Sequence, residues 1–93
     1  MEIPKSINVC GIPHNILLCD TASFGGDCLG EINNITAEIR INKDSPIELQ
    51  HVTLIHEWVH GVLVAFGYNE ESQNEHLVDA LAKAINLTFS LKE

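Results

Sequence analysis

Three residues in the second half of the chain have the types and the spacing of a catalytic metal site. His56, Glu57 and His60 form the pattern HExxH within the segment HEWVH at residues 56–60. Histidines four positions apart project from the same face of a helix, so both imidazoles can bind one zinc ion. The intervening glutamate points to the side of this pair, where it can take a proton from a zinc-bound water whose pKa the metal lowers. The segment predicts zinc held by His56 and His60, with Glu57 as general base. The alternative is a pair of histidines satisfied by hydrogen bonds inside a packed domain.

A catalytic zinc ion needs a third protein ligand, which leaves the fourth position for water. On the helix expected after residue 72, the apolar residues form one arc. Glu75 lies at the rim of that arc, whereas His76 faces away from it. We therefore predict Glu75 as the third ligand, and Asp79 one turn later could steady a ligating histidine. The competing role for Glu75 is the glutamate of a capping box with Ser72.

Two helices are expected to position these groups. Ser45 as N-cap, Pro46 as first helical residue and Glu48 as the third form a predicted capping box that opens a helix running to Phe66. This helix is apolar around most of its circumference, which is typical of a core helix, and Glu57 lies in its one polar gap. His51 falls well away from His56 around the axis and is predicted to be a surface histidine. The second helix is expected to run to about Ser90.

The first half of the chain predicts short strands separated by turns, with His14 in a turn. Candidate strands span residues 6–10, 15–19, 28–32 and 37–41. In the last of these, Ala37, Ile39 and Ile41 alternate with charged residues, and we interpret it as an edge strand. The sequence therefore predicts an α+β fold: a small, mostly antiparallel sheet followed by a central HExxH helix and a C-terminal helix, in one domain over residues 1–93.

Length and charge exclude several classes of function. A chain of 93 residues can bury one modest core. Its formal net charge of −8 argues against a nucleic-acid binder and against docking on anionic membrane. The longest apolar run, residues 61–67, is far short of the roughly 20 residues that span a bilayer. Residues 1–6 contain no apolar signal-peptide core, so we expect a cytoplasmic protein. The chain has three cysteines, an odd number that cannot all pair within it, and we expect them to be buried or half-buried free thiols.

The motif also resembles a known family. The segment HEWVH at residues 56–60, followed by NEHLVD at 74–79, resembles the gluzincin pattern of thermolysin-like peptidases, HExxH and then NExxxD. There the later glutamate is the third zinc ligand and the aspartate orients a zinc histidine, which implies these roles for Glu75 and Asp79. The segment TLIHEWVHG at 53–61 is more similar to small phage and prophage HExxH proteins, distant kin of the ImmA/IrrE and SprT-like metallopeptidases. The resemblance covers roughly residues 29 to 90 and implies a minimal zincin-like domain.

The expected function is zinc-dependent hydrolysis of peptide bonds in a peptide or protein substrate. The strand at residues 37–41 could align an extended substrate by strand addition. Tyr68 and His76 are the nearby candidates for stabilising the tetrahedral intermediate. Two other classes stay open: a zinc-stabilised binding or regulatory module without peptidase activity, and a metal-free interaction protein in which the motif is coincidental.

Overall fold

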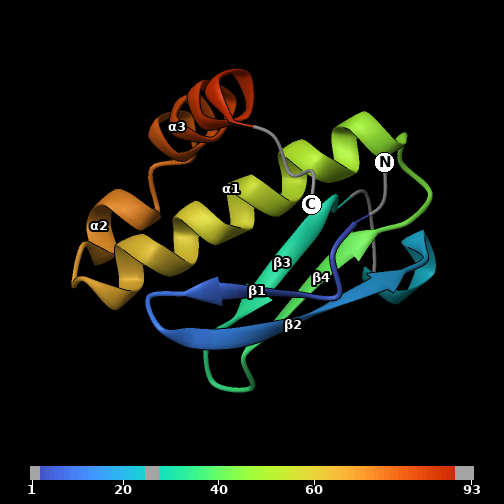
Figure 1. Cartoon of the computed structure of the whole chain (residues 1–93), viewed down its shortest axis with the longest axis horizontal. Helices are drawn as coiled ribbons and strands as arrows, with labels where there is room; N and C mark the ends of the chain where they lie inside the picture. Colours follow the sequence, from blue (N-terminus) through green and yellow to red (C-terminus); the bar gives the residue numbers. More distant parts are fainter. Residues whose placement is uncertain (1–2, 25–27, 90–93) are drawn as a thin grey trace.

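A four-stranded sheet lies against one long helix in this computed structural model, which describes residues 3–24 and 28–89 (Figure 1). The strands are β1 (Ser6–Val9), β2 (Ile12–Cys19), β3 (Gly30–Asn33) and β4 (Glu38–Asn42). A 3-10 turn (Thr21–Phe24) follows β2, and the helices are α1 (Ile47–Ala65), α2 (Asn69–Ser72) and α3 (Glu75–Thr88). The predicted α+β class is confirmed, with the central and C-terminal helices in their expected order. Ser90, the expected end of the last helix, lies outside the described residues.

The order of strands in the sheet corrects one prediction. The order is β1-β2-β4-β3, with antiparallel outer pairs and a parallel pair in the middle. The segment 37–41, interpreted above as an edge strand, lies almost wholly in β4, which pairs with a strand on both sides. Its alternating charges mark the solvent face of the sheet rather than its edge, because Arg40 forms an ion pair with Glu31 of the neighbouring strand at 3.2 Å. The true edges are β1 and β3.

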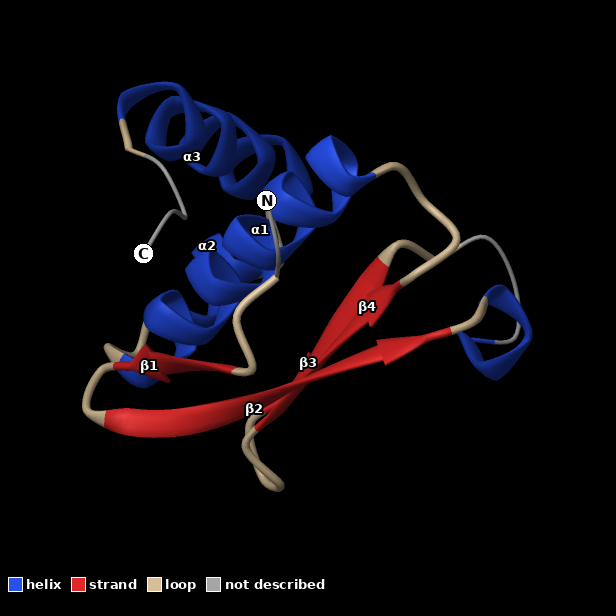
Figure 2. Cartoon of the chain, turned by 45° about the vertical axis from the view of Figure 1, so that its right-hand side comes forward, coloured by secondary structure: helices blue, strands red, loops and turns tan. Residues whose placement is uncertain are grey.

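Helix α1 lies between the sheet and α3 (Figure 2). On its sheet side, Leu54 packs against the buried Ile39 and Ile41. On the other side, Val59 packs against Val78 of α3. This two-sided packing agrees with the prediction of a core helix, although the buried residues of α1 include the polar Gln50, His51 and Thr53. Only the remaining side of α1 is left for a cleft.

Two glycines bring α1 and the sheet unusually close together. A Cβ atom on Gly30 of β3 would lie 2.7 Å from Thr53 Cγ2, and one on Gly61 of α1 would lie 2.8 Å from Ile32 Cδ1. Neither contact is tolerable between real side chains. The helix therefore approaches β3 at two points, one turn before and one turn after Glu57.

Both predicted capping boxes are wrong. Pro46 is the N-cap of α1 and no side chain caps that end, because the Ser45 hydroxyl donates to the carbonyl oxygen of Asn42 at 2.8 Å. Asn74 caps α3, and its side chain accepts a hydrogen bond from the backbone N–H of Leu77 at 3.1 Å. Ser72 instead ends α2.

The environments of two histidines and of the cysteines also differ from expectation. His51 is 5% exposed rather than on the surface, because it shares the side of α1 that carries Leu54 to the sheet. His14 is 3% exposed and lies within β2, not in a turn. All three cysteines are free as expected, but Cys10 and Cys28 are exposed and only Cys19 is half-buried.

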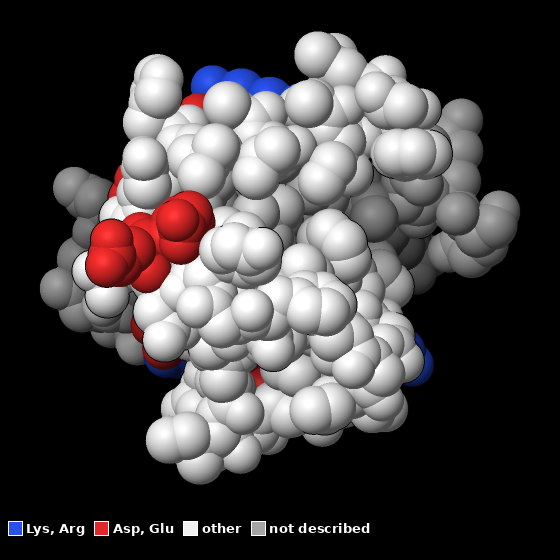
Figure 3. Space-filling view, turned by 90° about the vertical axis from the view of Figure 1, so that its left-hand side faces the viewer, with Lys and Arg blue, Asp and Glu red and all other residues white. Residues whose placement is uncertain are grey.

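Acidic side chains gather in one patch at the end of the molecule formed by α2, which contains Glu70 and Glu71 (Figure 3). Lysine and arginine side chains appear only at the margins of that view.

No helix within residues 3–24 and 28–89 has both the length and the apolar character needed to cross a membrane.

Candidate metal centre

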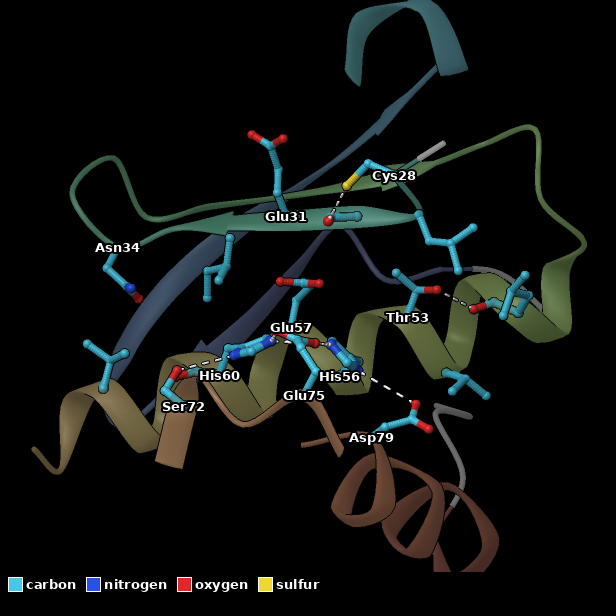
Figure 4. A pocket seen from close by; sticks show the side chains of 16 residues that line it. Cys28, Glu31, Asn34, Thr53, His56, Glu57, His60, Ser72, Glu75 and Asp79 are labelled. Carbon is cyan, nitrogen blue, oxygen red and sulfur yellow. Dashed lines mark hydrogen bonds and ion pairs between the residues drawn. The ribbon is translucent and has the colours of Figure 1, made fainter. Parts of the chain in front are cut away.

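A cleft of about 600 Å³ opens on the remaining side of α1 (Figure 4). One wall is β3, the floor is α1, and the start of α3 closes the opposite side. His56, Glu57, His60 and Glu75, the four residues predicted to do chemistry, all line it. These four residues come from two elements, α1 and α3, and meet in one place.

The three predicted ligands converge on a single point. The Nε2 atoms of His56 and His60 lie 3.2 Å apart. One Glu75 carboxylate oxygen lies 2.9 Å from Nε2 of His56, and the other lies 3.2 Å from Nε2 of His60. A tetrahedral zinc with bonds of about 2.0 Å separates its ligand atoms by about 3.3 Å. The donor types and their mutual distances therefore fit a zinc ion, and these residues form a group able to hold a metal.

Local structure explains why Glu75 is available for this role. Glu75 is the first residue of α3, and the side chain of Asn74 caps that helix. Glu75 is therefore not needed for a capping box with Ser72. Its carboxylate is consequently free to turn towards α1. The side chain is 69% exposed. Ion pairs this accessible to water stabilise a fold by only about 0–1 kcal/mol, so the contact with the histidines contributes little stability by itself.

Glu57 lies deeper, beneath β3. Thr53, Glu57 and Gly61 follow one another at four-residue intervals along the face of α1 that meets this strand, and the glycine contacts described above hold the two elements together there. Glu57 is 8% exposed. Burial raises the pKa of its carboxyl from 4.5 to about 7, with smaller contributions from the negative charges of Glu75 and Glu31. A carboxyl group titrating near neutrality is suited to exchange protons with substrate.

The outward ring nitrogens of the two histidines have different partners. Nδ1 of His60 lies 3.2 Å from the hydroxyl of Ser72, a hydrogen bond. Nδ1 of His56 lies 3.8 Å from a carboxylate oxygen of Asp79, which is close but too long for a hydrogen bond. Asp79 also pairs with Lys83 at 2.8 Å, and this hydrogen bond holds the pKa of the Asp79 carboxyl below its usual value.

Sequence reasoning missed Ser72, which it assigned to a helix cap. No periodic rule links Ser72 to His60, because a loop and a helix boundary separate them. The only sequence feature that pointed to Ser72 is its position as a small polar residue three positions before Glu75. Tyr68 and His76, the candidates for stabilising a tetrahedral intermediate, are exposed and do not line the cleft.

Comparison of this chain with known protein families, with curated proteins and with solved structures gives no match.

Proposed function

We propose that this chain is a zinc-dependent peptidase of the zincin type, with His56, His60 and Glu75 as ligands and Glu57 as general base. One observation carries the proposal: three zinc-type donors meet at ligand-like distances in a cleft that also holds a buried carboxyl group. The resemblance of residues 56–60 and 74–79 to the gluzincin pattern supports the same reading.

Zinc bound there would supply a Lewis acid that makes a water molecule more acidic and polarises a carbonyl oxygen. Glu57 would accept the proton of the attacking water and deliver it to the leaving nitrogen. Its buried position keeps bulk water from competing for that proton. Glu75, at the mouth of the cleft, would also offset part of the metal charge.

The edge strand β3, rather than β4, would align an extended substrate. The carbonyl oxygen of Leu29 accepts a hydrogen bond from the N–H of Asn42 at 2.8 Å. Because hydrogen-bonded pairs alternate in an antiparallel ladder, the backbone groups of Gly30 and Ile32 point away from β4. The carbonyl oxygen of Gly30 accepts a hydrogen bond from the Cys28 thiol at 2.9 Å, so the groups of Ile32 are the ones offered to a substrate strand. A substrate strand added there would run along the cleft wall above Glu57.

A second candidate, a zinc-stabilised binding module, is favoured by one observation. Neither Tyr68 nor His76 lines the cleft, so neither is placed to stabilise a tetrahedral intermediate. In that case the metal would join α1 to α3 without catalysing a reaction.

Glu57→Gln separates the two candidates. We expect this change to lower peptide hydrolysis by about 10²–10⁴-fold while zinc content is retained, because glutamine cannot accept a proton. Glu48→Gln is the matched control, since Glu48 is exposed on the same helix outside the cleft. The measurement is single-turnover cleavage of a peptide library followed by mass spectrometry. Absence of cleavage by the zinc-loaded wild type would favour the binding module.

A further inference from the structure

We propose that Ser72 is a positioning residue that holds the imidazole of His60 ready for zinc, through a hydroxyl able both to accept from and to donate to that histidine. This inference rests on the zinc site proposed above. Ser72 ends α2 and is 7% exposed. Its Oγ lies 3.2 Å from Nδ1 of His60 and 3.4 Å from the carbonyl oxygen of the same residue. The hydroxyl is thus within reach of one ring nitrogen and one fixed acceptor.

The chemistry of a hydroxyl suits a histidine that must change tautomer. A serine hydroxyl has one hydrogen to donate and two lone pairs to accept with. In the metal-free protein, Nε2 of His60 lies 3.2 Å from a Glu75 oxygen and 3.2 Å from Nε2 of His56. When Nε2 donates to the carboxylate, Nδ1 is left as an acceptor for the Ser72 hydrogen. To bind a metal, Nε2 must present its lone pair, and the proton then resides on Nδ1.

Ser72 can accommodate that second state without moving. Its Oγ accepts the hydrogen of Nδ1, while its own hydrogen rotates towards the carbonyl oxygen of His60. The ring is held in the same orientation in both states. The side chain of His60 is only 14% exposed, so loss of this partner would leave the Nδ1–H poorly satisfied and oppose the tautomer that the metal requires.

His56 has no equivalent partner among the described residues. Its Nδ1 faces only Asp79, at 3.8 Å, and that carboxylate is engaged by Lys83. A carboxylate can accept from Nδ1 but cannot donate to it. Of the two histidines, His60 is therefore the one whose ring is fixed by a neighbouring side chain, and Ser72 is that side chain.

Zinc affinity tests the proposal. We expect Ser72→Ala to weaken zinc binding by about 10–100-fold in chelator competition, and Ser72→Thr, which keeps the hydroxyl, to restore most of it. Ser45→Ala is the matched control, because it also removes a serine hydroxyl that donates to a backbone carbonyl, but outside the cleft. Thermal unfolding of the metal-free variants shows whether each one folds. Equal zinc affinities for folded Ser72→Ala and Ser45→Ala would overturn the proposal.

A second readout uses the wild type alone and decides the matter even if Ser72→Ala does not fold. In ¹⁵N-histidine NMR spectra, we expect His60 to carry its proton on Nε2 without metal and on Nδ1 with zinc, where its exchange with water is slow. An Nδ1 proton that exchanges rapidly in the zinc-loaded protein would contradict the role of Ser72. A wild type that binds no zinc would overturn this inference and the proposed function together. Zinc binding without peptide hydrolysis would overturn only the peptidase.

Discussion

Two pairs of histidines are buried or half-buried in this fold, His56 with His60 and His14 with His51, and the surroundings of their rings differ. His56 and His60, with side chains 20% and 14% exposed, direct their Nε2 atoms at each other and at Glu75. His14 and His51 are buried more completely, and the Nε2 atom of each has no hydrogen-bond partner among the described residues. The more deeply buried pair is not the candidate site, so depth of burial alone does not identify it. Convergence of donor atoms on one point does.

The largest expected effect is on zinc affinity when Glu75, the acidic member of the converging group, is replaced. Glu75→Ala should weaken zinc binding by more than the roughly 10–100-fold typical of groups that only support a ligand, because it removes a donor atom. His76→Ala is the matched control: it alters the next residue of α3, which is exposed and does not line the cleft. Chelator competition measures both. Equal affinities for the two variants would assign the third ligand elsewhere.

The buried carboxyl group of Glu57 should make the free energy of unfolding depend on pH. Because the pKa of Glu57 is raised from 4.5 to about 7 on folding, the metal-free folded chain binds more protons than the unfolded chain in that range. The free energy of unfolding should therefore fall as pH rises from about 4.5 to 7, by about 3 kcal/mol. Glu57→Gln should lack this loss and be the more stable form above pH 7. Denaturant unfolding of both proteins across this range checks the prediction, and a difference independent of pH would contradict it.

A smaller effect is expected beside His56. Asp79→Asn should weaken zinc binding by about tenfold, the low end of the usual range, because the contact with Nδ1 is long and Lys83 shares the carboxylate. Lys83→Met is an informative partner variant, since it releases Asp79 towards His56 and should leave affinity unchanged or raise it. A loss as large as that of Glu75→Ala would show that Asp79 is itself a ligand.

The smallest expected effect concerns His51, one of the two buried histidines outside the candidate site. His51→Leu should increase the free energy of unfolding by about 1 kcal/mol, because it removes a buried nitrogen that has no partner. Zinc affinity should not change. The measurement is denaturant unfolding of the metal-free protein, with zinc titration of the same sample. Destabilisation together with loss of zinc would mean that the two pairs of histidines are not distinct.

Local periodicity was sufficient to predict the two helices that carry the candidate site. Spacing of four residues placed His56 and His60 on one face of a helix, and the apolar arc of the second helix placed Glu75 at its rim. Both inferences use contacts within a single helix, where geometry follows directly from sequence separation.

Contacts between distant segments were not predictable in the same way. The alternation at residues 37–41 identifies the two faces of a strand but says nothing of its neighbours, so β4 was misplaced at an edge. Ser45 and Ser72 both match a Ser-x-x-Glu capping pattern, yet each hydroxyl bonds elsewhere once the chain is folded.

The most direct test of the central claim is native mass spectrometry of the protein after zinc loading and dialysis near neutral pH. If His56, His60 and Glu75 form a metal centre, the wild type should carry one zinc ion per chain and His60→Ala should carry none, with both proteins folded by circular dichroism. A wild type without zinc, or equal zinc content in the two proteins, would contradict the account.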